Sequence, residues 1–173
     1  MFLDETGSNV AMARRYARSK RGRPVYGSIP HNRGKNLTVV GAVSATGGLL
    51  AWQSYDGAMT GARFLTFVVE ALIPALAPGD VVVMDNLSAH KTKAVRAALE
   101  AAGVGVLYLP RYSPELNPIE LCWARVKAEL RGVAARTREM LRAAVAEALG
   151  RVGVEEVRRW VRHCGYRLTS KPS

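Results

Sequence analysis

Cysteine and histidine are scarce in this chain, which has two of the first and three of the second. Cys122 and Cys164 stand far apart and form no C-x-x-C pair, and the histidines are equally scattered. These spacings exclude the ligand pattern of a zinc finger and provide no disulfide framework. We therefore expect free, buried thiols in a reducing compartment.

Long apolar runs are also missing from the 173 residues. No stretch approaches the ~20 apolar residues that span a bilayer, and the first residues, MFLDETGS, lack the basic and apolar regions of a secretory signal. The sequence predicts no membrane partner and a cytoplasmic protein. Its length and its hydrophobic content of 49% predict one domain, residues 1–173, with a substantial core.

Acidic residues are absent between Glu5 and Asp56. This segment nevertheless contains eight Lys and Arg residues, namely Arg14, Arg15, Arg18, Lys20, Arg21, Arg23, Arg33 and Lys35. Together with a net charge of +11, it favours a polyanionic partner, with nucleic acid ahead of a membrane surface. The basic residues after Trp123 are mixed with acids and fit solvated helix faces. We therefore expect the acid-free segment, in a long loop or loose hairpin, to contact DNA.

Periodicity and turn residues predict an α/β architecture. The expected strands are residues 1–6, 36–45, 49–55, 81–84 and 104–109, and the expected helices are residues 60–76, 91–102 and several from Pro118 onward. The second and third strands form a hairpin, and a helix joins the fourth strand to the fifth, which makes that pair parallel. The sequence therefore predicts a mixed five-stranded sheet flanked by helices, with additional helices toward the C-terminus.

The stretch YSPELNPIE marks the start of the helix at Pro118. Asn117 suits the N-cap, and Pro118 suits the first helical position, where a missing N–H is not needed. Glu120 then falls at the third position, from which it can bond back to the Asn117 amide in a capping box. Capping alone explains these residues unless other acids come close to Glu120.

Two further acids stand at the ends of strands. Asp85 directly follows VVVM, where α/β sheets commonly place functional groups, although it can equally be a turn residue. Asp4 lies in the first strand, and Glu5 beside it points to the opposite face. Converging carboxylates repel one another unless a cation neutralises them, and oxygen-only ligands suit Mg²⁺ or Mn²⁺. A metal-dependent site in a DNA-binding protein points to two-metal phosphodiester chemistry.

The motifs FLDET, VVVMDNLSAHK and LPRYSPELNPIELCW, with HCGY near the end, resemble bacterial transposases of the mariner superfamily, specifically the insertion-sequence 630 type. Asp85 and Glu120 are separated by residues 86–119, 34 in number, which is the spacing of that family. The resemblance implies a ribonuclease-H-like fold and identifies Asp4, rather than Glu5, with Asp85 and Glu120 as the metal-binding acids. It implies Mg²⁺ or Mn²⁺, two ions, as cofactor.

The resemblance also implies DNA cleavage and strand transfer, with transposon ends and target DNA as partners. It further implies a homo-oligomer in the active complex and a location at the bacterial nucleoid. Members usually have helix-turn-helix modules ahead of this domain. We expect such a region to be absent here and supplied by a separate polypeptide.

Other residues of these motifs receive supporting roles. Asn86 and Asn117 are expected beside the metal ligands, and Lys91 and Arg111 are expected to contact DNA. For His90, contact with phosphate or with a metal ligand and simple packing in a loop stay equally open. Two other functions remain alternatives: a phosphoacceptor signalling domain, because MDN ends an apolar strand, and a remnant that binds DNA without cutting it.

Overall fold

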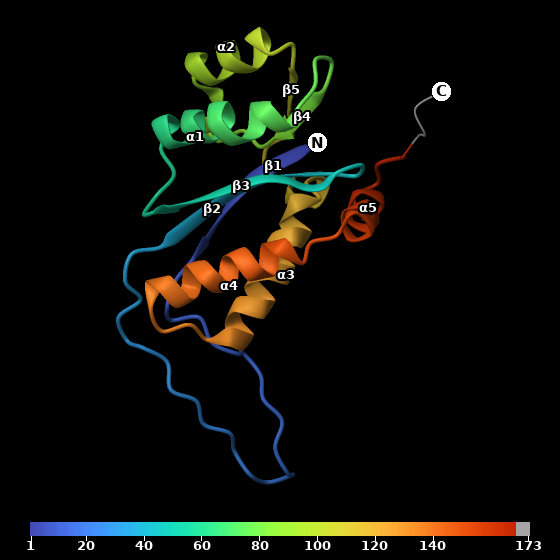
Figure 1. Ribbon diagram of the computed structural model, residues 1–173. Helices are drawn as coiled ribbons and strands as arrows, with labels where there is room; N and C mark the ends of the chain where they lie inside the picture. The colour runs from blue at the N-terminus through green and yellow to red at the C-terminus, as the bar shows by residue number, and fades with distance from the viewer. Residues whose placement is uncertain (169–173) are drawn as a thin grey trace.

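Five strands form one mixed sheet in the order β3-β2-β1-β4-β5, in a computed structural model that describes residues 1–168 (Figure 1). The strands are β1 (Phe2–Ser8), β2 (Leu37–Ser44), β3 (Gly48–Asp56), β4 (Val81–Met84) and β5 (Gly105–Tyr108). The first three strands pair antiparallel, whereas β4 pairs parallel with both β1 and β5. This is the mixed sheet that the sequence predicts, with β1 at its centre.

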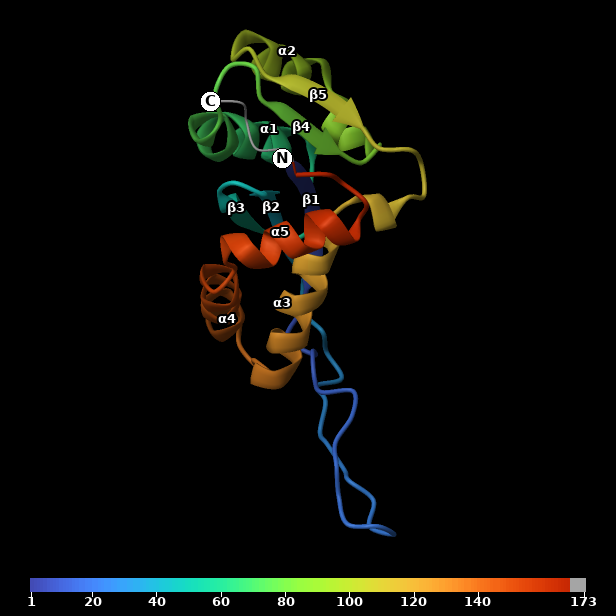
Figure 2. The ribbon, with the colours of Figure 1, turned by 90° about the vertical axis from the view of Figure 1, so that its right-hand side faces the viewer.

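Five α-helices cover both faces of the sheet. They are α1 (Gly61–Phe67), α2 (Lys93–Ala101), α3 (Ile119–Val133), α4 (Arg138–Gly150) and α5 (Val154–His163). One apolar core lies between the sheet and α1 and α2, and a second lies between the sheet and α3, α4 and α5 (Figure 2). Side chains alternate between the two faces of β1, so this strand contributes to both cores. Phe2 packs into the second core and Leu3 into the first.

Gly41 allows α3 to approach the centre of the sheet closely. In the register of the β1–β2 pair, Gly41 lies opposite Asp4. A Cβ atom at this position would lie 3.1 Å from the ring of Trp123 and 3.3 Å from the Ala51 carbonyl oxygen. Glycine therefore lets the buried Trp123 pack against β2 and holds α3 beside the first strand.

The predicted helix over residues 60–76 is correct in position but not in kind. Thr60 caps α1 as expected, accepting from the Arg63 amide, but the α-helix ends at Phe67. A π-helical turn (Val68–Leu72) and a 3₁₀ turn (Ile73–Ala75) follow. Pro74 has no N–H to give to a regular helix, which is why the last turn changes its hydrogen bonding.

The N-terminal basic segment leaves the body of the protein as an extended arm, residues 9–36, between β1 and β2 (Figures 1 and 2). Arg136 holds its base, since its Nη1 donates to the carbonyl oxygens of Val10 and Met12, both at 3.1 Å. Arg138 donates to the Lys35 carbonyl oxygen at 2.6 Å. The arm contains no strand, so the expectation of a long loop is confirmed.

Candidate active site

The pairing of β1 with β4 brings the first two acids together. Phe2 lies beside Val83 in the parallel register, so Asp4 comes beside Asp85, two residues further along each strand. Neighbouring strands are only about 4.8 Å apart. Asp4 is buried, whereas about half of the Asp85 side chain is exposed, because Asp85 lies just beyond the end of β4.

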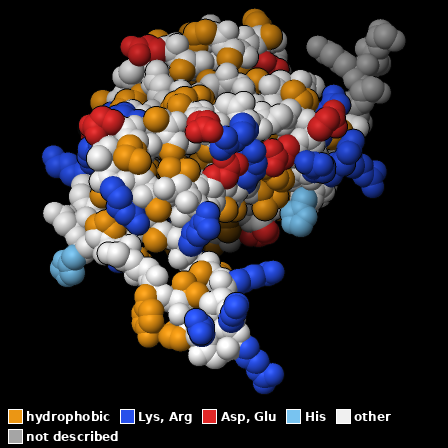
Figure 3. All heavy atoms as spheres, turned by 60° about the horizontal axis from the view of Figure 1, so that its bottom comes forward, with side chains coloured by type: hydrophobic (Ala, Val, Ile, Leu, Met, Phe, Trp, Pro, Cys, Tyr) orange, Lys and Arg blue, Asp and Glu red, His pale blue; other side chains and the backbone are white. Residues whose placement is uncertain are grey.

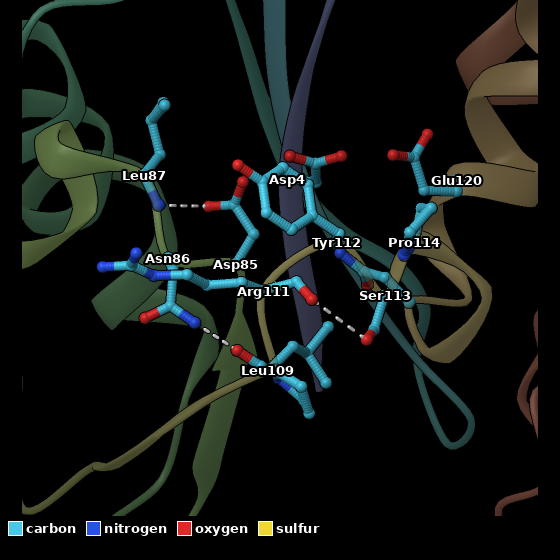
Figure 4. Close-up of a pocket in the computed structure, with 12 residues that line it drawn as sticks. Asp4, Asp85, Asn86, Leu87, Leu109, Arg111, Tyr112, Ser113, Pro114 and Glu120 are labelled. Atoms are coloured by element: carbon cyan, nitrogen blue, oxygen red, sulfur yellow. Dashed lines mark hydrogen bonds between the residues drawn. The ribbon is translucent and has the colours of Figure 1, made fainter.

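Glu120 reaches the same place from the first turn of α3. Asp4, Asp85 and Glu120 line one open cavity of about 460 Å³, together with Asn117 and the loop Leu109–Pro114. In Figure 4 the Asp4 carboxylate is seen between those of Asp85 and Glu120. The structure therefore gathers the three acids that the sequence analysis selected, from two strands and one helix.

The predicted capping box is wrong. α3 begins at Ile119, with Pro118 at its cap position, and no side chain caps it. The Asn117 backbone amide donates to the Pro114 carbonyl oxygen and not to Glu120. The Asn117 side chain is buried, and its Nδ2 donates to the Leu3 carbonyl oxygen at 3.4 Å. Asn117 thus ties the start of α3 to the strand that carries Asp4, and the Glu120 side chain is free of a capping role.

Burial and repulsion act on Asp4. Burial, and after it the nearby charge of Glu120, together raise the pKa of Asp4 to about 8. Within residues 1–168, no three acidic, His or Cys side chains close into a preassembled metal-binding group. Asp4 and Glu120 repel each other in this arrangement, and a bound cation would neutralise that repulsion.

The donor atoms of the cavity fit a divalent cation of the magnesium type. All three acids offer oxygen, which Mg²⁺ and Mn²⁺ prefer to nitrogen or sulfur. The Asn117 Oδ1 atom is also buried and finds no hydrogen-bond partner among the described residues. Because an unpaired buried oxygen is unfavourable, a cation or its bound water is a suitable partner for it.

His90 is not a DNA contact, since its side chain is fully buried. Its Nε2 lies 2.9 Å from Glu5 Oε2 and its Nδ1 lies 2.7 Å from Asp85 Oδ1. Burial alone lowers the pKa of His90, but the hydrogen bonds with Asp85 and Glu5 outweigh it and raise the pKa to about 9. The contact with His90 in turn lowers the pKa of Asp85.

Glu5 is the residue whose role the sequence analysis missed. Strand alternation correctly places it on the face opposite Asp4, but that face is where His90 is buried against Phe64. Glu5 therefore contacts Asp85 through His90. No local sequence pattern predicts this contact, because Glu5 and His90 are 85 positions apart. The only indication in the sequence is that both residues belong to the quoted motifs.

The other predicted residues fall into two groups. Asn86 donates to the Leu109 carbonyl oxygen and fixes the loop at the cavity, which also contains the exposed Arg111 (Figure 4). Lys91 is exposed, with its Nζ 5.2 Å from the centre of the Tyr108 ring. The arm residues Arg14, Arg15, Arg18, Lys20, Arg21, Arg23 and Lys35 are all exposed, outside the cavity.

Tyr112 has an unusual backbone in the same loop. Its φ is 59°, and its side chain is 97% exposed at the mouth of the cavity. A non-glycine residue in the left-handed region is strained, and such strain clusters at functional sites. An exposed aromatic ring held in this way is suited to contact a sugar or base.

Comparison with known proteins agrees with this geometry. A family model described as DDE superfamily endonuclease matches residues 1–142. A comparison with curated protein sequences finds no match.

No helix within residues 1–168 is both long and apolar enough to cross a bilayer.

Solved structures of the Mos1 mariner transposase share the fold. Its paired-end complex with the left transposon end has a TM-score of 0.74 at 21% identity, covering 93% of this chain and 50% of that one. Its paired-end complex with Mn has a TM-score of 0.73 at 20% identity, with coverage of 93% and 51%. The Mos1 catalytic domain has a TM-score of 0.66 at 16% identity, with coverage of 93% and 75%. The ribonuclease-H-like fold is thereby confirmed, and this chain spans about half the length of the Mos1 chain in its paired-end complex.

Proposed function

Because the chain belongs to the DDE superfamily endonucleases, we propose that it is the catalytic domain of a DNA transposase that cleaves and joins phosphodiester bonds. The observation that supports this most directly is the meeting of Asp4, Asp85 and Glu120 in one cavity. The Mos1 structures, which are described as transposase complexes with a transposon end and with Mn, have the same fold.

Two ions of Mg²⁺ or Mn²⁺ would be held by the carboxylates of Asp4, Asp85 and Glu120. Bound there, such ions activate the attacking hydroxyl and stabilise the leaving oxygen. Asp85 is kept ionised by His90 and by the Leu87 amide, which donates to its Oδ1 at 2.9 Å. Asn117 and Asn86 keep the two loops of the cavity in place.

DNA is the partner that the charge distribution supports. Arg111 and Tyr112 lie at the mouth of the cavity, and the arm adds a cluster of cations with no acid among them. Figure 3 shows Lys and Arg side chains along the arm where it projects from the body. Such contacts with phosphate position a protein on DNA without reading its sequence. Because these contacts do not read sequence, we assign recognition of the transposon ends to a helix-turn-helix module. We further propose that the active complex is a homo-oligomer at the bacterial nucleoid.

Cleavage of a labelled duplex in Mg²⁺ or Mn²⁺ tests the proposal. Asp4→Asn, Asp85→Asn and Glu120→Gln should each abolish cleavage and leave the far-ultraviolet circular dichroism spectrum unchanged. Glu115→Gln is the matched control, because Glu115 lies in the same loop but outside the acid cavity. A degenerate, DNA-binding remnant would bind the duplex and leave it uncut in every variant and in the parent.

A further inference from the structure

The polar face of β1 continues beyond Asp4. Asp4, Thr6 and Ser8 alternate with the residues that face α1 and α2, so all three face α3, and all three are buried. The Ser8 hydroxyl finds no hydrogen-bond partner among the described residues. Ser8 thus marks the polar end of this face, and its oxygen is enclosed by the surrounding protein.

Two basic side chains, Lys127 and Arg131, lie on the same face of α3 as Glu120, further toward the C-terminal end of the helix. Lys127 and Arg131 follow Glu120 by seven and eleven residues. Because these intervals are close to two and three helical turns, the side chains share one stripe, about 10 and 16 Å along the helix from Glu120. Within residues 1–168, neither makes an ion pair or a side-chain hydrogen bond, whereas Arg125 on another face of α3 pairs with Glu129 and Glu156.

A groove of about 930 Å³ lies where these two faces meet the base of the arm. Among its lining residues are Ser8, Arg14, Arg15, Arg33, Lys127 and Arg131, and no acidic residue lines it in the described part of the chain. Cations without acids in a concave surface concentrate a positive potential. The groove therefore suits an anion with several charges spaced along it.

We propose that this groove binds the phosphate backbone of duplex DNA about five base pairs from the phosphate held at the acid cavity. The separation follows from the ~16 Å between Glu120 and Arg131 and a rise of 3.4 Å per base pair. The proposal rests on the proposed function, which puts DNA in the acid cavity. It adds Lys127 and Arg131 as DNA-binding residues and fixes the direction in which the duplex leaves the cavity, along α3 toward the arm.

Binding at several salt concentrations tests the groove without cleavage. We expect Lys127→Gln with Arg131→Gln to weaken duplex binding and to reduce the slope of log K against log salt by about 1.8, or about 0.9 for each lost phosphate contact. The matched control, Lys93→Gln with Arg96→Gln, removes the same charge from α2, at the other end of the molecule (Figure 1). Its slope should equal that of the parent.

Phosphates neutralised as methylphosphonates locate the contact. Placed about five base pairs from the cleavage position, they should weaken binding by the parent but not by the Lys127/Arg131 double variant. If the parent binds with a salt slope that the double variant keeps, the groove is wrong and the proposed function stands. If the parent binds no duplex at any salt concentration, both are wrong.

Discussion

The three carboxylates of the cavity differ in burial and in their hydrogen-bond partners. Asp4 is buried at the centre of the sheet, while Asp85 is half exposed and supported by the fully buried His90. The two acids therefore differ in charge when no metal is bound, since burial and Glu120 raise the pKa of Asp4 and His90 lowers that of Asp85. Asp4 must lose its proton before it can bind a cation, which links metal binding to pH.

His90 is expected to position Asp85 through a chain that starts at Glu5. His90→Gln removes the charge that Asp85 faces, and the loss of such a supporting contact typically weakens metal affinity or activity about 10- to 100-fold. The half-saturating Mg²⁺ concentration for cleavage should rise by that factor, with a smaller rise for Glu5→Gln. Lys93→Gln, on α2 away from the cavity and the groove, is the control. An unchanged Mg²⁺ dependence in His90→Gln would contradict this role.

The stability of the metal-free protein should fall as pH rises. Burial and the Glu120 charge raise the pKa of Asp4 from 3.8 to about 8, and the contacts of His90 with Asp85 and Glu5 raise its pKa from 6.5 to about 9 against the opposing effect of burial. Between each pair of values the folded state binds more protons than the unfolded chain, so the free energy of unfolding decreases with pH.

Thermal melting in EDTA from about pH 5 to about pH 9 measures this effect. Asp4→Asn should remove the part of the fall that lies below about pH 8, and His90→Gln should remove the part between about pH 6.5 and 9. Glu115→Gln is the control. A parent and an Asp4→Asn variant whose melting temperatures change in parallel across the range would show that Asp4 has no raised pKa.

Elements position the residues, and their prediction from sequence succeeded where the pattern is local. Asp85 could be placed because a wholly apolar run ends just before it, and Glu120 because two prolines mark a helix start. The partners of Asn117 and His90 could not be placed, since Asn117 bonds to Leu3, 114 positions away. Such contacts depend on the packing of β1 against α3, which no local pattern contains.

The C-terminal helix α5 supports the acid cavity from outside the region that the family model matches. Tyr166, just after α5, donates to the Leu116 carbonyl oxygen at 2.8 Å, and its ring lies 4.7 Å from that of Phe2. It therefore connects the loop that leads to Glu120 with the start of the strand that carries Asp4. This gives the HCGY motif a structural role in the site.

Tyr166→Phe should loosen this connection while keeping the ring contact with Phe2. We expect a loss of about 1 kcal/mol in the free energy of unfolding, as for one hydrogen bond. We also expect a rise in the half-saturating Mg²⁺ concentration for cleavage. Tyr55→Phe is a matched control, because its hydroxyl lies within hydrogen-bond reach of Gln53 Oε1 and the Arg63 carbonyl oxygen, away from the cavity. If both variants lose stability but neither changes the Mg²⁺ dependence, Tyr166 is only a packing residue.

At the scale of the whole molecule, charge is separated by position. The net charge of +11 includes an arm without acids, whereas several arginines of the helices are paired. Arg125, Arg151 and Arg158 pair with acids on the helices, and Arg138 and Arg142 pair with Asp56 at the end of β3. For these paired arginines, the expectation that the basic residues after Trp123 lie on solvated helix faces agrees with the structure. Lys127 and Arg131 could not be separated from them by sequence, because only the fold shows that these two face the base of the arm.

The proposed role of Asp4, Asp85 and Glu120 is to hold metal at a DNA phosphate. The most direct measurement is cleavage of a duplex whose scissile phosphate has a sulfur in place of one non-bridging oxygen, compared in Mg²⁺ and in Mn²⁺. Sulfur binds Mg²⁺ poorly and softer ions better, so the parent should cut the modified duplex slowly in Mg²⁺ and recover in Mn²⁺. Asp85→Asn should cut it in neither. Equal cleavage of both duplexes by the parent and by Asp85→Asn would contradict the account.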